Sequence, residues 1–461
     1  MGLNAPEPVQ LERNLRGFIL FRVFFNARFY YPVFTILFLD YGLTLEQFSI
    51  LNLVWALTIV LAEVPSGALA DLFGRKRLLV FASMLMFVEM ALLTFVPVGE
   101  SLLLFLVFLA NRICSGLAEA AASGADEALA YDSLAGLGRE SEWASILERT
   151  TRYMSAAFFT NMILGALSYD HQLVNGALRL VNESWELPVH FIIRLPVILT
   201  LLTSCIVVFT TMRMAEPNPK EASQSPQSVG NSGVWASIRL SFAQVLDAAG
   251  WTFNHRFVLF VILAALALDS VARQFVILAS EYYRIIHIPT AWFGFIGAGM
   301  SLIGLVNARI SKYLVTQRSP FFNLCVLSTI LMTGLLGIMF TIPWFGVLFA
   351  IGAFSMMGMV SFQSSYYLNR EVDSAHRATV LSFRGLALNL GLGIASLLYT
   401  LLIAELKRQQ TAIDDPTHLQ ELTFVNSLKA FPVYFLFLVA LITLLGRRFF
   451  ADFQKCLRGP A

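Results

Sequence analysis

The stretch that decides the fold is Gly67-Ala-Leu-Ala-Asp71-Leu-Phe-Gly74-Arg75-Lys76-Arg77, which lies between two long apolar runs. Its two glycines allow close backbone approach or a positive φ angle. The three consecutive cations are of the kind that collects in the cytoplasmic loops of membrane proteins. The stretch therefore predicts a short cytoplasmic hairpin between two membrane-spanning helices, with Asp71 as an acid at the membrane edge.

The composition is that of a membrane protein. Hydrophobic residues make up 57% of the chain and charged residues 13%, whereas soluble proteins carry roughly 25% charged residues. The four cysteines have no disulfide or metal spacing. The sequence also lacks a phosphate-binding loop, a zinc-protease motif and a G-x-S-x-G nucleophile motif. We therefore expect no enzymatic activity, no cofactor, no metal and no nucleic-acid partner.

A membrane-spanning helix needs about 20 mainly apolar residues. Twelve runs of the sequence meet this need: 17–40, 46–70, 77–97, 101–131, 149–168, 189–212, 256–283, 290–311, 320–341, 344–368, 377–404 and 425–447. Lys and Arg collect in alternate connections, which places both termini in the cytoplasm. We expect an all-α membrane protein with 12 transmembrane helices in two six-helix halves.

The longest polar interruption divides the chain into three predicted parts, namely 1–212, a cytoplasmic linker at 213–250, and 251–461. The first part of the linker is rich in Pro, Ser, Asn and Gln, which is typical of disorder. The second part predicts an amphipathic helix, either on the membrane surface or packed on the bundle. Its apolar residues at helical spacing are Trp235, Ile238, Phe242, Val245 and Ala249.

In this layout the opening stretch resembles the major facilitator superfamily, whose motif between the second and third helices reads G-x-L-a-D-r-x-G-r-k-x-x-l. The matching residues are Gly67, Leu69, Ala70, Asp71, Gly74, Arg75, Lys76 and Leu79, and Leu72 departs from the motif. The resemblance covers all predicted spans and implies a secondary transporter that works by alternating access. It also implies a cytoplasmic latch at Asp71 and gate residues at Arg370 and Arg377. We add Asp126 and Glu127 to the cytoplasmic gate, where gating with Arg75 or Arg152 and a direct role in transport are both open.

The run 101–131 carries the strongest chemical signal. Arg112, Glu119 and Asp126 recur every seven residues, so on a continuous α-helix they stay within about 40° of one face over roughly 21 Å. A charged group at the bilayer centre costs at least about 2.5–3.5 kcal/mol, so the stripe must face water or a partner. Asn111-Arg112 to Gly116 also resembles the family motif of the fourth helix, which implies a link between Arg112 and proton transfer. A purely structural bridge inside the bundle is the alternative.

Other polar groups inside predicted spans extend the set of possible coupling or cavity residues. Glu89 is either a protonatable site or a quiet partner of Arg112 or Arg22. Asp269 and Arg273 are spaced to bridge directly along one helix, as a structural pair, a substrate contact or a gate. The full set is Arg22, Asn26, Glu89, Arg112, Glu119, Asp269, Arg273 and Gln363.

The leading interpretation is proton-coupled export of a small amphipathic metabolite or drug, because acids and arginines in the first four spans form a titratable path. The first alternative is proton-coupled uptake of an anionic nutrient, which Arg22, Arg112 and Arg273 would suit. A non-transporting membrane receptor or scaffold is an alternative of another class. We expect a monomer that meets protons, a small solute and lipid in a bacterial inner membrane.

Overall fold

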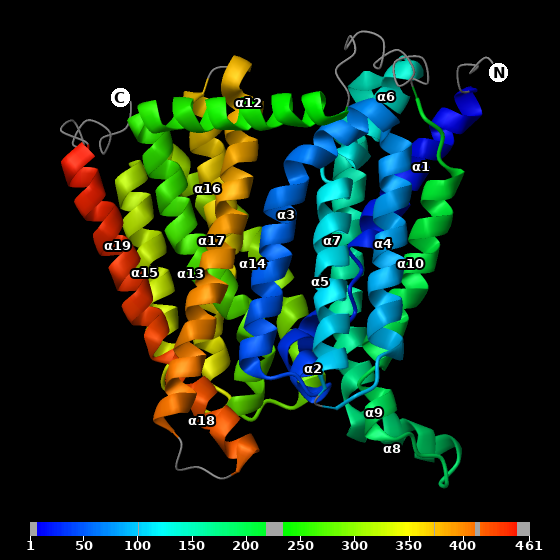
Figure 1. Cartoon of the computed structure of the whole chain (residues 1–461), viewed down its shortest axis with the longest axis vertical. Coiled ribbons are helices and arrows are strands. Elements are labelled where there is room, and N and C mark those ends of the chain that lie inside the picture. The colour runs from blue at the N-terminus through cyan, green and yellow to red at the C-terminus, as the bar shows by residue number, and fades with distance from the viewer. Residues whose placement is uncertain (1–6, 100, 218–233, 373, 411–414, 450–461) are drawn as a thin grey trace. The chain divides into compact units, whose positions relative to one another are not determined.

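The computed structural model describes residues 7–99, 101–217, 234–372, 374–410 and 415–449, and its regular elements are all helices. The chain divides by internal contacts into two compact units, one formed by 1–33 and 57–243 and the other by 34–56 and 244–461. Within each unit the long helices run side by side (Figure 1). Helix α3 (Leu45–Phe73) contributes its first part to the second unit and the rest to the first.

The first unit is built around α4, which packs along α5 and α10, and around α1, which contacts α6, α7 and α10. Its core includes Phe21, Leu79, Met86, Ala118 and Leu129. Besides α3, its elements are α1 (Pro8–Phe25), η1 (Tyr31–Val33), α4 (Arg75–Phe95), α5 (Leu102–Ala122), α6 (Ala125–Gly136), η2 (Glu140–Glu142), α7 (Trp143–Tyr169), α8 (His171–Val181), α9 (Val189–Ile192) and α10 (Leu195–Arg213).

The second unit is built around α13, which is more deeply buried than any other span of the described chain. It packs against α2, α16, α17 and α19. The elements of this unit are α2 (Phe34–Asp40), α13 (Arg256–Ile285), α14 (Thr290–Gln317), α15 (Pro320–Ile338), α16 (Gly346–Glu371), α17 (Ser374–Gln409), α18 (Pro416–Leu428) and α19 (Ala430–Phe449).

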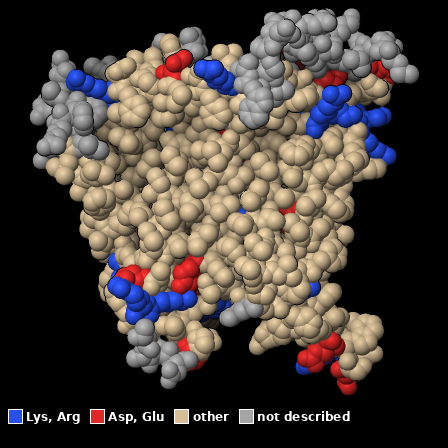
Figure 2. Space-filling model, viewed as in Figure 1, with Lys and Arg blue, Asp and Glu red and all other residues tan. Residues whose placement is uncertain are grey.

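Ten helices of the described residues are long and apolar enough to cross a membrane, and they coincide with ten of the twelve predicted spans. The predicted span at 149–168 is α7, which carries Glu148, Arg149 and Arg152 and falls outside this set. Charged side chains gather at the ends of the helices, and the middle of the visible face is nearly free of them (Figure 2). The chain is therefore an all-helical membrane protein.

The predicted first span, 17–40, is wrong as one continuous helix. Helix α1 ends at Phe25, a 3-10 turn covers Tyr31–Val33, and α2 begins at Phe34. Pro32 has no amide hydrogen to continue an α-helical ladder, and the Phe29 N–H instead donates to Thr200 Oγ1 at 3.1 Å. After the break, α2 belongs to the second unit, where the Thr35 N–H donates to Ser280 Oγ at 2.9 Å.

A helix, α12 (Val234–Asn254), covers the second part of the predicted linker, and its amphipathic role stays a prediction. Near its end Trp251 stacks on His255 and His376 and joins the core of the second unit. Residues 218–233 of the predicted disordered segment lie outside the described residues, as does the side chain of Trp235. The boundaries of the three predicted parts stay a prediction.

Candidate functional site

A buried ion pair lies at the break in the first span. Arg28, just after α1, pairs with Glu89 in the middle of α4, and their side chains are 4% and 0% exposed. The guanidinium also lies 5.5 Å from the ring centroid of Phe25. The sequence suggested Arg112 or Arg22 as the partner of Glu89, and this was wrong because the helix break after Phe25 places Arg28 against α4 instead. Glu89 is therefore a counter-ion within the packed first unit.

Arg112 lies beside this pair on α5 and is 4% exposed. Its Nε donates to Asn111 Oδ1 at 3.2 Å, and Asn111 Nδ2 donates to the Glu89 carbonyl at 2.8 Å. Arg112 also hydrogen-bonds the side chain of Tyr30. Three segments that are distant in the sequence thus meet in one polar network. The sequence showed the charged residues of this network but not that they lie together.

Glu119 lies two turns further along α5 and is exposed on the first unit. Its carboxylate interacts electrostatically with Arg28, Glu89 and Arg22. The charge of Glu119 acts electrostatically on a second acid, Glu63 of α3. The two helices touch at this level, because Ser66 Oγ donates to the Ala120 carbonyl at 2.7 Å. The contact between α3 and α5 brings Glu63 near Glu119, a proximity that sequence spacing did not indicate.

The predicted stripe of Arg112, Glu119 and Asp126 on one continuous helix face is wrong. Helix α5 ends at Ala122 and α6 begins at Ala125, with Gly124 between them at φ 75°. Glycine populates this left-handed region without steric cost, so the chain can turn there.

The turn brings both acids of α6 to α1. Asp126 lies 3.2 Å from Arg22 Nε, and Glu127 pairs with the same guanidinium. Asn26 caps the end of α1 by donating to the Arg22 carbonyl at 2.7 Å. Arg22, Asp126 and Glu127 therefore join α1 to α6 within the first unit, and Asn26 shapes the helix end.

The opening sequence motif forms a tighter turn than predicted. Helix α3 continues to Phe73 and α4 begins at Arg75, so the reversal rests on Gly74 alone at φ 93°. Gly67 lies within α3 rather than in a loop. The backbone of Asp71 is also part of α3, and its side chain lies outside the described part of the structure. The latch assigned to Asp71 stays a prediction.

The Arg75 side chain and the first turn of α4 have partners inside the first unit. Arg75 pairs with Asp132 of α6 and donates to the Ala128 carbonyl at 3.1 Å. The backbone N–H of Lys76 donates to the Glu216 carboxylate at 2.9 Å. An acid at a helix N-terminus stabilises the helix through its free N–H groups and its dipole. The sequence did not identify Asp132 or Glu216, because both lie far along the chain from the motif.

A further exposed cluster lies between α6 and α7, outside the spans. Arg139 pairs with Glu12 of α1 and donates to Glu142 at 2.7 Å. The hydrogen bond from Arg139 lowers the pKa of Glu142. The cluster thus ties the start of α1 to the turn before α7.

In the second unit the predicted bridge between Asp269 and Arg273 is confirmed. Arg273 also donates to Asn389 Oδ1 of α17 at 3.0 Å, a contact that sequence spacing did not indicate. Asp269 is 4% exposed. The pair joins α13 to α17.

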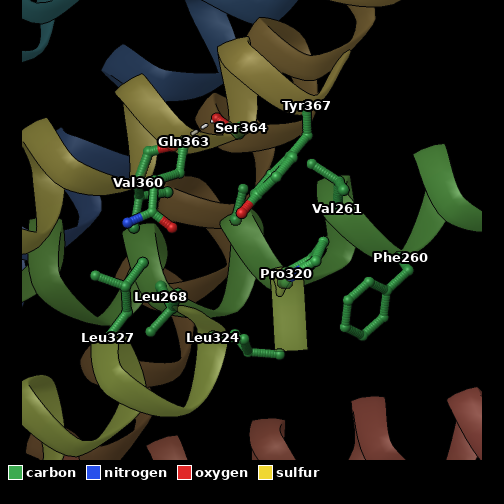
Figure 3. Close-up of a pocket in the computed structure, with 12 residues that line it drawn as sticks. Phe260, Val261, Leu268, Pro320, Leu324, Leu327, Val360, Gln363, Ser364 and Tyr367 are labelled. Carbon is green, nitrogen blue, oxygen red and sulfur yellow. Dashed lines mark hydrogen bonds between the residues drawn. The ribbon is translucent and has the colours of Figure 1, made fainter. Parts of the chain in front are cut away.

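Gln363 lies in a different place, in a pocket between α13, α15 and α16 (Figure 3). Arg370 is in the last turn of α16 and is exposed. Arg377 is part of α17, and its side chain lies outside the described residues. The structure therefore separates the predicted residues into an Arg28–Glu89–Arg112 network with Glu119 nearby, an Arg22 cluster, the Asp269–Arg273 pair and the Gln363 pocket.

Comparison with known proteins identifies the family of this chain. Residues 17–396 match the model of the Major Facilitator Superfamily, so the chain belongs to this family and is a secondary transporter rather than an enzyme. No curated protein sequence matches the chain.

Solved structures with the same fold cover nearly the whole chain. A bacterial homologue of the human lysosomal transporter Spinster has a TM-score of 0.67 at 13% identity, with 98% of each chain covered. A variant of the nucleoside transporter NupG has a TM-score of 0.62 at 15% identity, covering 95% of this chain and 99% of that one. A D-xylose-proton symporter has a TM-score of 0.59 at 11% identity, covering 94% and 96%.

Proposed function

We propose that the chain is a proton-coupled exporter of a small amphipathic metabolite or drug. It would act as a monomer in a bacterial inner membrane, with both termini in the cytoplasm. The observation that carries the proposal is the pair of acids Glu63 and Glu119, which interact on facing helices of the first unit. Proton-binding acids within membrane spans are typical of coupling sites.

The two acids differ from the other charges of the first unit in their surroundings. Glu89 and Asp126 are buried against arginines, whereas Glu119 is exposed. Two neighbouring carboxylates repel each other when both are charged, and a proton bound to either of them removes that repulsion. We therefore assign the proton to the Glu119–Glu63 pair, with Glu89 as the fixed counter-ion of Arg28.

The alternative, uptake of an anionic nutrient, needs cations that are open to the anion. Arg22 is paired with Asp126 and Glu127, and Arg273 with Asp269. These pairs neutralise two of the three arginines on which that alternative depends, so they favour a neutral or weakly polar amphipathic solute.

The solved neighbours named above are described as a nucleoside transporter and a D-xylose-proton symporter. Their identities of 15% and 11% show a shared fold. The substrate class and the proton coupling proposed here rest instead on the charges of this chain.

The test starts from a thermal-shift screen of the purified protein against neutral amphipathic metabolites and drugs. The best compound is then followed in inverted vesicles with an imposed pH gradient, where export appears as proton-driven uptake. Glu119→Gln should abolish gradient-driven flux and keep substrate exchange, because exchange needs no net proton movement. Glu148→Gln on α7, an exposed acid paired with Arg152, is the matched control. Driven flux that survives Glu119→Gln would remove Glu119 from the coupling path.

A further inference from the structure

The pocket around Gln363 is separate from the charged network of the first unit. It lies where α13 and α15 begin and α16 approaches its end. It is a partly open hollow whose empty space, open solvent included, is about 390 Å³. Most of its wall is apolar, including Phe260, Leu268, Leu324 and Leu327. Sites for small molecules are typically apolar clefts with a few polar groups that orient the ligand.

The polar groups of this pocket offer donors. Gln363 is 4% exposed, and its Nε2 has no hydrogen-bond partner among the described residues. Leaving such a buried donor unpaired costs about 1–3 kcal/mol. Figure 3 shows the amide of Gln363 and the hydroxyl of Tyr367 on the same side of α16, both directed into the pocket. Tyr367 accepts from Asn323 Nδ2 at 2.6 Å, which leaves its own hydrogen for another acceptor.

The third polar group is already paired, and the lining carries no charge. Ser364 Oγ donates to the Val360 carbonyl at 2.6 Å and accepts from Arg384 at 3.0 Å. None of the described residues that line the pocket is charged. A ligand that fits must therefore be mainly apolar and present a neutral acceptor, since a buried charge without a partner is costly.

The pocket connects with the outer surface of the spans. A larger groove, whose empty space is about 760 Å³ with open solvent included, lies between α13, α15 and α19. It shares Phe260, Ala264, Leu268 and Leu324 with the pocket. Cys325 of its wall is exposed. The outer surface of membrane-spanning helices is surrounded by the bilayer. Lipid acyl chains are therefore the molecules that reach this groove.

We propose that this pocket binds one acyl chain of a membrane glycerophospholipid. The chain enters through the groove beside α19 and packs along Leu268 and Leu327. The ester carbonyl of the lipid accepts hydrogen bonds from Gln363 Nε2 and from the Tyr367 hydroxyl. The site is independent of the proton pair in the first unit and belongs to the second unit alone.

Native mass spectrometry of the full chain, delipidated in detergent and titrated with dioleoylphosphatidylethanolamine, tests this site. The wild-type protein should hold one lipid more tightly than any further ones. Gln363→Leu should weaken this first binding roughly three- to tenfold, as expected for one net hydrogen bond. Leu324→Trp should abolish it by filling the space that the pocket and groove share.

The matched control is Leu336→Trp on the same helix, where the side chain is 44% exposed and lines neither cavity. It should leave the first binding unchanged. Melting temperatures of all three variants in detergent show whether they are folded, and Gln363→Leu should melt no lower than wild type because it removes an unpaired donor. Equal lipid binding by Leu324→Trp and Leu336→Trp, or by Gln363→Leu and wild type, would overturn the proposal.

Discussion

Gly165 on α7 is the position where a single added methyl group tests the packing most directly. An ideal Cβ at this residue would lie 1.8 Å from the Phe29 carbonyl oxygen and 3.2 Å from Pro32 Cγ. Real Cβ contacts essentially never fall below 3.0 Å, so the alanine variant needs a separation about 1.2 Å larger. The obstructing atom is backbone and cannot rotate away. The break between α1 and η1 must move, or α7 must.

The energetic balance predicts destabilisation. An alanine in a helix is favoured over glycine by about 1 kcal/mol, whereas overpacking costs about 1–3 kcal/mol and occasionally more. The displacement also strains the bond from the Phe29 N–H to Thr200 Oγ1. We therefore expect Gly165→Ala to lower the melting temperature in detergent. Hydrogen–deuterium exchange should rise in the peptide 26–33.

Gly176→Ala is the matched control, because Gly176 is also helical, lies in the same unit and has no atom within 4 Å of an added Cβ. It should leave the melting temperature and exchange in 26–33 unchanged or slightly improved. If Gly165→Ala behaves like Gly176→Ala in both measurements, the close approach of α7 to the helix break is refuted.

Two further predictions concern the first unit. Arg28→Met leaves Glu89 buried without its partner and should lower the free energy of unfolding by about 3–5 kcal/mol, whereas Arg28→Met combined with Glu89→Leu should recover most of the loss. Melting curves in detergent compare the two variants, and equal melting of the single and double variants would contradict the pairing. Gly74→Ala places a side chain at φ 93° beside Glu216 and should lower the free energy of unfolding by about 1–3 kcal/mol. Gly67→Ala, with open space around the added Cβ, should be neutral or stabilising, and similar denaturation of the two variants would argue against a strained turn at Gly74.

The sequence predicted the features that depend on neighbouring residues. The positions of ten spans follow from apolar composition, and the bridge between Asp269 and Arg273 follows from spacing along one helix. The short turn at the opening motif was predicted from its glycines and cations. The sequence did not predict that the turn rests on Gly74 alone. The family also follows from that motif, because its residues are contiguous.

Partners that are distant in the chain could not be predicted in this way. The sequence listed Arg22, Glu89, Arg112 and Asp126 as charges in need of partners, but it could not say which cation meets which acid. That choice depends on two breaks, one after Phe25 and the other at Gly124. The breaks change the directions of the helices, and the periodic pattern of the sequence does not predict these changes.

The sequence by itself therefore determined the class of protein, the approximate spans and the set of charged residues that a membrane interior must accommodate. The tertiary structure alone decided that Arg28 neutralises Glu89, that the contact of α3 with α5 brings Glu63 near Glu119, and that Gln363 lines a separate apolar pocket. The physical reason is that local pattern fixes which face of a helix is apolar or charged. The pairing of those faces depends on where the chain turns and on how closely glycines such as Gly165 let two segments approach.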